Sequence, residues 1–187
     1  MLPLEPLVQG QWLPRYLWGT RILYSSSIVI KFRGSIAMQY WLMKSEPSEF
    51  SIDDLKRVKV EPWDGVRNYQ ARNMMKKEMK KSDLAFMYHS NCDEIGIVGI
   101  MAIAREGYVD HSAFNKKDKH YDAKSNPENP RWFRVDVRYK RKLKRTITLA
   151  ELKKYKKLAE MQLLKRGNRL SIMPVSKKHW DFILLLE

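Results

Sequence analysis

Cysteine is nearly absent from the sequence, and long apolar runs are missing altogether. Cys92 is the single cysteine, so the chain can form no internal disulfide and no cysteine-based zinc site. This usage fits a reducing compartment, and we expect a cytoplasmic protein. No apolar run reaches the roughly 18 residues of a membrane-spanning helix, so we expect no membrane partner.

Histidine is also sparse, and its placement does not match the common catalytic or metal-binding motifs. The histidines form neither the His-x-x-x-His pair of a helical zinc site nor a deaminase pattern. No glycine-rich loop precedes a Lys-Ser or Lys-Thr pair, and Gly96-Ile-Val-Gly99 lies in an apolar run that is a poor phosphate cradle. Residues brought together only by folding could still form a catalytic triad, but the sequence favours a protein without enzymatic activity, metal or cofactor.

Acidic residues are too few to balance the basic ones. Lys and Arg number 36 against 21 Asp and Glu, a formal net charge of +15. This excess favours a polyanionic partner, nucleic acid or an acidic membrane, because neutralised phosphates release counterions. A solvated lysine-rich surface would give the same charge. The basic run 138–157, with Glu151 as its one acid, is either a phosphate-tracking face or the solvated side of a strand and helix.

Residues 1–37 differ in composition from the rest of the chain. They combine prolines with isolated aromatic residues and contain one acid, Glu5. The apolar run 28–30 is too short for a signal peptide, whereas the arginines and serines are compatible with an organelle transit peptide. We favour Met38 as the natural start, with 1–37 an upstream or artificial extension outside a domain formed by 38–187.

From Met38 onward, apolar patterns predict strands mixed with helices. Alternation is clearest at 132–139, where Val135 and Val137 share one face with Phe133 and Tyr139. The polar segment 105–130 is predicted as a long loop, which is unusual unless it is functional. The predicted strands are 38–44, 83–90, 95–104, 132–139 and 170–175. The predicted helices begin after Ser51, run from Asn68 to about Lys80, cover about 149–166 and begin after Ser176.

Helical spacing indicates which side chains point inward. Leu55 and Val58 should do so from the first helix, for which Ser51-x-x-Asp54 resembles a capping box. The other inward sets are Ala71, Met75 and Met79; then Leu149, Leu152, Tyr155, Leu158 and Leu163; then Trp180 and Ile183. Gly96 and Gly99 suggest close backbone approach within a strand. The mixture of predicted strands and helices along the chain indicates an α+β fold with a small curved or closed sheet flanked by helices.

Three segments are polar and aromatic where a plain core would be apolar. They are 40–47, 63–73 and 86–91. Strand ends are often polar, and a lone tryptophan is more often core than ligand platform, which is the better explanation of Trp41. Trp63, between Pro62 and Asp64, is as compatible with a stacking platform as with the core.

These segments, with 130–132 and 167–175, closely resemble the EVE domain in their residues and in their order along the chain. The resemblance covers nearly all of 38–187. The resemblance implies a PUA-like fold, a small β-barrel with flanking helices. It also implies a binding module that reads a modified base in DNA or RNA, since the related SRA and YTH domains hold such a base between aromatic side chains. Lys44-Ser45 resembles the Lys-Ser that opens the YTH pocket, and Trp63 resembles a cage tryptophan of that pocket.

A site for an extruded base needs an aromatic face for stacking and polar groups for the base edge. We expect Trp63 and Tyr69 to stack. The predicted base-binding residues are Lys44, Ser45, Glu46, Trp63, Asn68, Tyr69, Tyr88, His89, Ser90 and Ser171. The predicted phosphate-binding residues are Arg67, Arg72, Lys165 and Arg169, each of which could instead belong to an ordinary solvated surface.

Two alternatives to the modified-base reader stay open. One is an enzyme acting on nucleic acid, a hydrolase or base-modifying protein that uses His89 with a carboxylate such as Glu46. The other is a reader of unmodified structured RNA. Dependence on metal or turnover would separate the enzyme from a reader, which needs neither.

Overall fold

The computed structural model describes residues 38–187, so the predictions for 1–37 lie outside the described residues. One six-stranded sheet runs in the order β2-β5-β4-β3-β1-β6. The pairing of β1 with β3 is parallel and the other pairings are antiparallel. The strands are β1 (Tyr40–Ser45), β2 (Val60–Trp63), β3 (Leu84–His89), β4 (Gly96–Val109), β5 (Phe133–Thr148) and β6 (Ile172–Val175).

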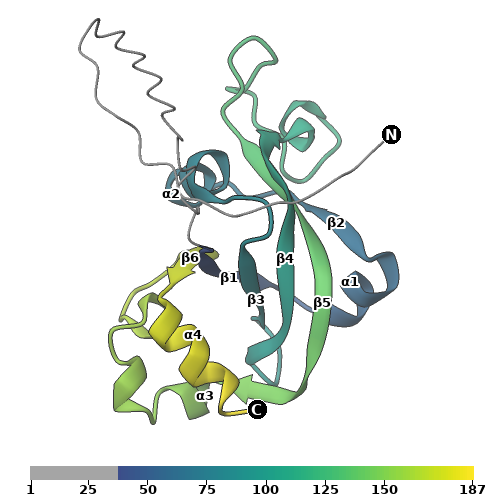
Figure 1. Ribbon diagram of the computed structural model, residues 1–187. Coiled ribbons are helices and arrows are strands. Elements are labelled where there is room, and N and C mark those ends of the chain that lie inside the picture. Colours follow the sequence, from purple (N-terminus) through teal and green to yellow (C-terminus); the bar gives the residue numbers. More distant parts are fainter. Residues whose placement is uncertain (1–37) are drawn as a thin grey trace, which may run out of the picture. The chain divides into compact units, whose positions relative to one another are not determined.

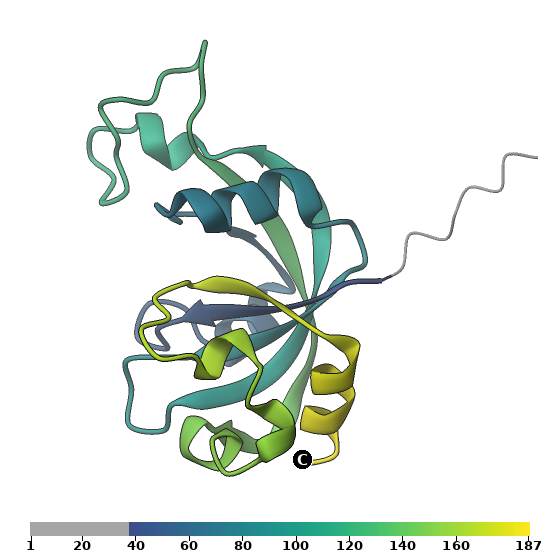
Figure 2. The same cartoon turned by 90° about the vertical axis from the view of Figure 1, so that its left-hand side faces the viewer.

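The helices lie around this curved sheet (Figures 1 and 2). α1 (Ile52–Val58) packs against β5. α2 (Tyr69–Asn73) continues into a π-helix (Met74–Glu78) that contacts β4 and β5. α3 (Leu149–Leu152) is a single turn after β5, and α4 (Lys177–Leu184) follows β6. Single 3₁₀ turns occupy His111–Phe114, Lys156–Leu158 and Gln162–Leu164.

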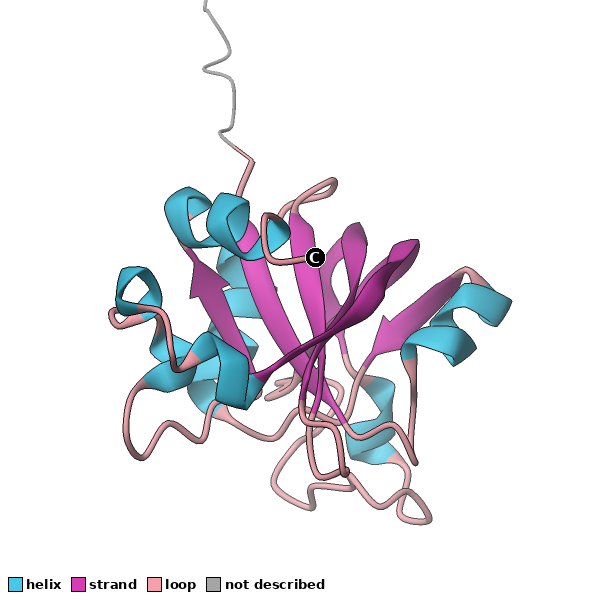
Figure 3. Ribbon diagram, turned by 90° about the horizontal axis from the view of Figure 1, so that it is seen from below, coloured by secondary structure: helices cyan, strands magenta, loops and turns pink. Residues whose placement is uncertain are grey.

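The α+β class is confirmed, but a closed barrel is not shown. In the described part of the chain, β2 and β6 are the outer strands of the sheet and are not paired with each other. Figure 3, seen from below, shows the strands twisting past one another with helices on both sides of the sheet. The architecture is therefore a curved open sheet flanked by helices.

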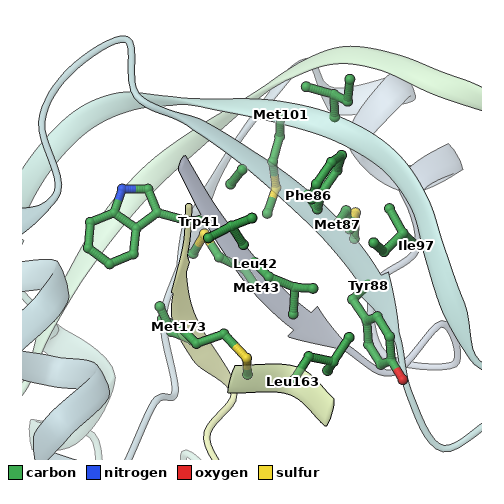
Figure 4. Close-up of a cluster of buried hydrophobic side chains, with 14 of the residues drawn as sticks. Trp41, Leu42, Met43, Phe86, Met87, Tyr88, Ile97, Met101, Leu163 and Met173 are labelled. Carbon is green, nitrogen blue, oxygen red and sulfur yellow. The ribbon is translucent and has the colours of Figure 1, made fainter. Parts of the chain in front are cut away.

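The core forms where the middle strands meet α4. Trp41 is fully buried, and its indole N–H donates to an Asp83 carboxylate oxygen over 3.1 Å. The prediction that Trp41 is a core residue is therefore confirmed. Trp180 of α4 stacks on Phe86 of β3 with ring centres 3.8 Å apart. Methionines and branched side chains from β1, β3 and β4 fill the rest (Figure 4).

Several local predictions are confirmed by hydrogen bonds. Ser51 and Asp54 form the reciprocal capping box of α1. Asn68 caps α2 by accepting from the amides of Gln70 and Ala71, and Ser176 caps α4 by accepting from that of His179. The predicted inward residues of these last two segments, Ala71, Met75, Met79, Trp180 and Ile183, are buried.

Other predictions are wrong. Val58 is exposed, because α1 ends there and the chain turns away at Lys59, whose φ is 69°. The predicted helix 149–166 is one α-turn followed by two 3₁₀ turns. The strand predicted at 95–104 runs on to Val109, and the one predicted at 132–139 runs on to Thr148. β2 was not predicted at all.

Candidate functional site

A cleft of about 640 Å³ opens beside the end of β1. Its walls come from the β1–α1 connection, from β2 with the turn after it, and from Lys119 and His120 of the long loop between β4 and β5. Five of the predicted base-binding residues line it, namely Lys44, Ser45, Glu46, Trp63 and Ser171. One predicted phosphate-binding residue, Arg67, lines it too. Segments far apart in the sequence therefore meet at one site.

The end of β1 supplies the polar side of the cleft. The Lys44 amide donates to the Ser171 carbonyl over 2.8 Å, which joins two lining segments. Burial lowers the pKa of Lys44, and its ammonium lies 5.8 Å from the ring centre of Tyr88. Among the described residues no acid pairs with Lys44, so its N–H donors are open to a ligand.

Trp63 forms part of the opposite wall. Its side chain is 8% exposed, so it belongs to the core and also lines the cleft. The Trp41 and Trp132 indoles donate to aspartates, whereas that of Trp63 has no partner in residues 38–187. Trp63 thus offers the cleft an aromatic surface and a donor.

Arg67 ties the wall to the long loop. Its guanidinium donates to an Asp110 carboxylate oxygen over 2.7 Å and to the His120 carbonyl over 2.7 Å. Burial alone would raise the pKa of Asp110, but hydrogen bonds from Arg67 and Ser112 hold it below its usual value. Arg67 is therefore committed to an internal ion pair, which leaves it little capacity to hold a phosphate.

The remaining predicted base-binding residues lie outside the lining of the cleft. Asn68 is occupied as the cap of α2. Tyr88 is 2% exposed, beneath Lys44. The Ser90 amide donates to the Ser45 carbonyl over 3.0 Å, which fixes the ends of β1 and β3 together.

His89 lines a second hollow, together with Pro47 and Ser51 of the β1–α1 connection. Its Nε2 accepts the Ile52 amide N–H over 3.2 Å, and burial lowers the pKa of the imidazole despite the opposing charge of Asp53. Glu46 lines the first cleft and accepts from the Asn91 amide over 2.9 Å. The pair of His89 and Glu46 is therefore divided between two hollows, whereas Asp53 and Glu94 line the same hollow as His89.

Tyr69 lies on the surface at the start of α2. It is 48% exposed and stacks on Trp132, with ring centres 5.0 Å apart. The guanidinium of Arg72 lies 4.8 Å from the Tyr69 ring centre and that of Arg131 lies 5.6 Å from it. Stacking and cation–π contacts hold this exposed ring in place.

The other predicted phosphate-binding residues differ in their surroundings. Arg72 donates to the Arg131 carbonyl and to Asn73. Lys165 and Arg169 are exposed, and neither is paired within residues 38–187. Since Ser171 lines the cleft, Arg169 is close to its edge along the chain.

Sequence reasoning missed several lining residues, among them Glu61, Lys119 and His120. Glu61 lies on the unpredicted strand β2. Lys119 and His120 lie in the segment 105–130, whose unusual length was the one available signal that it serves the site.

Cofactor and membrane features can be assessed for residues 38–187. No group of three or more His, Cys, Asp or Glu side chains in this range could hold a metal ion. None of the helices described has the length and apolar character needed to cross a bilayer.

Known proteins share both sequence and fold with this chain. The family model described as the EVE domain matches residues 39–186. Thymocyte nuclear protein 1 of Danio rerio is 49% identical over 166 residues, 79% of this chain and 71% of the relative. The Homo sapiens protein of that name is 47% identical over 167 residues, covering 79% of this chain and 73% of the relative.

Solved structures extend the comparison. Human THYN1 protein in complex with 5-methylcytosine-containing DNA is 47% identical, with a TM-score of 0.75 over 79% of this chain and 96% of that chain. A Pseudomonas syringae protein is 44% identical, with a TM-score of 0.77 over 79% and 98%. The expected cytoplasmic location is contradicted, because the names of the vertebrate relatives point to a nuclear protein.

Proposed function

The chain belongs to the EVE domain family, and from that premise we propose that it binds DNA and holds one extruded, modified base in the cleft lined by Trp63. The human relative was solved with DNA containing 5-methylcytosine, which makes that base the first candidate. The family resemblance also supports assigning a PUA-like fold to this protein. In this assignment the curved sheet corresponds to the PUA-like barrel but is not closed.

The meeting of Trp63 with Lys44, Ser45 and Ser171 at one cleft carries the proposal. A volume of about 640 Å³ lies within the range of sites for small organic ligands. An aromatic wall can stack on a base and bury its methyl group, and free donors can read its edge. Each component that a base needs is present within one opening.

Binding without turnover is the second part of the proposal. His89 is engaged by the Ile52 amide and faces a different hollow from Glu46. A reader should return its DNA unchanged. Incubating 5-methylcytosine DNA with the protein, with and without Mg²⁺, and measuring the mass of the DNA tests this. A change in mass would favour the enzymatic alternative.

Replacing Trp63 tests the base-binding site. Stacking contributes about 1–3 kcal/mol per base, so Trp63→Ala should weaken binding of a 5-methylcytosine oligonucleotide by about tenfold to a hundredfold. The preference over the unmodified strand should also shrink. Fluorescence anisotropy measures both affinities, and a parallel RNA oligonucleotide shows whether RNA competes.

Because Trp63 is also part of the core, two further variants separate binding from folding. Trp63→Leu keeps an apolar side chain in the wall and removes the aromatic face, so it should reproduce the loss of affinity while the protein stays folded by circular dichroism. Trp63→Phe keeps a ring and should retain most of the affinity. Full binding by a folded Trp63→Leu variant would refute the proposed site.

A further inference from the structure

The cleft is rich in carboxylates although the chain carries a net charge of +15. Three of these carboxylates already have partners. Glu46 accepts from Asn91, Glu49 pairs with Lys119, and Asp64 pairs with Arg134 over 2.9 Å. Within residues 38–187, Glu61 is the one lining carboxylate without a hydrogen-bond or ion-pair partner. Its acceptor capacity is open to a ligand.

Glu61 and Trp63 occupy neighbouring positions on one face of β2. Alternate residues of a strand point to the same side, and both side chains line the cleft. Burial raises the pKa of Glu61, and the nearby carboxylates of Asp64 and Asp136 raise it further, against the opposing charges of Arg134 and Arg57. A partly buried carboxylate that accepts no hydrogen bond is unfavourable. A hydrogen-bond donor on a bound ligand would offset this cost.

An ionised carboxylate only accepts hydrogen bonds, and this fixes which base edge suits it. Cytosine presents an exocyclic amine, which donates, and carboxylates are known to accept from that group. Thymine presents a carbonyl oxygen at the same position and would face the carboxylate with another acceptor. Lys44, which has only donors and lines the same cleft, suits the ring nitrogen and carbonyl oxygen of cytosine.

We propose that Glu61 accepts the exocyclic amine of an extruded 5-methylcytosine and thereby separates this base from thymine. The inference rests on the proposed function and deepens it, since it names the residue that selects the base. 5-Methylcytosine and thymine share the ring methyl group and differ in the edge that Glu61 would face. Trp63 can stack on both, so discrimination falls to the polar groups.

The test compares two oligonucleotides that are identical except for one unpaired central base, 5-methylcytosine or thymine. The unpaired position removes differences in the energy of extrusion. A hydrogen bond to a charged group contributes about 1.5–3 kcal/mol, so the wild-type protein should bind the 5-methylcytosine strand about tenfold to a hundredfold more tightly. Glu61→Gln, whose amide can donate or accept, should reduce this ratio to about threefold or less.

Glu49→Gln is the matched control, because it removes one charge from the same cleft at a carboxylate that is already paired. It should alter both affinities alike and leave their ratio unchanged. Equal binding of the two bases by the wild-type protein, or an unchanged ratio in a folded Glu61→Gln variant, overturns the role of Glu61. If the wild-type protein binds neither strand, the proposed function itself fails, and the two failures are therefore distinguishable.

Discussion

The imidazole of His89 caps the start of α1. Its Nε2 accepts from the Ile52 amide, and burial lowers its pKa below the usual 6.5. The unfolded chain therefore takes up this proton first as the pH falls. The contribution of His89 to stability is complete above about pH 6.5 and is lost as the pH falls below that value.

This linkage predicts that the free energy of unfolding decreases as the pH falls below about 6.5, in part through His89. His89→Gln provides an oxygen that can accept from the Ile52 amide but does not titrate, so the variant should show a shallower decrease. Urea denaturation at several pH values measures both slopes. Parallel curves would show that His89 does not titrate with folding.

The polar ends of β1 and β3 show how far residue-level prediction reached. Lys44 and Ser45 line the cleft as predicted, whereas His89, the register partner of Ser45, does not. The β1–α1 connection separates them, with Glu49 and Phe50 on the cleft side and Ser51 on the side of His89. The course of such a connection depends on packing, which the local sequence pattern does not encode.

The segment after β5 shows why one element was predicted wrongly. Leu149, Leu152, Tyr155 and Leu158 recur every third residue. In an α-helix this spacing turns by about 60° at each step, so the residues drift around the axis, whereas in a 3₁₀-helix they stay in line. Leu158, in the first 3₁₀ turn, and Met161, just before the second, are buried in the same core cluster as Leu152. Leu152, Leu158 and Leu163 are buried as predicted and Leu149 and Tyr155 are half-buried against the same core, but the period was assigned wrongly.

The two glycines of β4 were predicted to allow close approach, and the geometry confirms it. A Cβ on Gly96 would lie 2.4 Å from the Ile147 carbonyl oxygen, which belongs to the paired backbone of β5. A Cβ on Gly99 would lie 2.4 Å from Cδ1 of Ile52. The first contact is with rigid backbone and the second mainly with the flexible end of a side chain.

Gly96→Ala should therefore destabilise the protein more than Gly99→Ala. Overpacking typically costs about 1–3 kcal/mol, and we expect Gly96→Ala near the upper end of this range and Gly99→Ala near the lower end. Chemical denaturation of the two variants gives the comparison. The reverse order would mean that the strand edge at Gly96 yields more readily than the packing of Ile52.

At the scale of the whole molecule, the distribution of charge matters more than its sum. Three of the ten basic residues of the run 138–157 are less available than the sequence suggests, because Arg141 pairs with Glu187, Lys142 with Asp53 and Arg145 with Glu151. The pairings of Arg141 and Lys142 join residues far apart in the chain, so the sequence alone could not reveal them. Arg138 and Lys140 remain exposed without partners in the described residues.

We expect Lys165 and Arg169 to contact phosphates better than the paired cations of the basic run do. Both are exposed, both lack partners within 38–187, and they precede Ser171 at the cleft. If the protein neutralises about four phosphates of duplex DNA, the slope of log affinity against log salt concentration should be about −3 to −4. Replacing Lys165 and Arg169 together by Ala should reduce the magnitude of that slope by about 2.

Arg138→Ala with Lys140→Ala is the matched control, since it removes the same charge from exposed residues of the basic run on β5. It should change the slope little. Equal losses in the two double variants would assign phosphate binding to the basic run as well, because each released counterion contributes alike wherever the phosphate is held. A wild-type slope near zero would instead mean that the charge of +15 serves the solvated surface, and that base contacts alone hold the DNA.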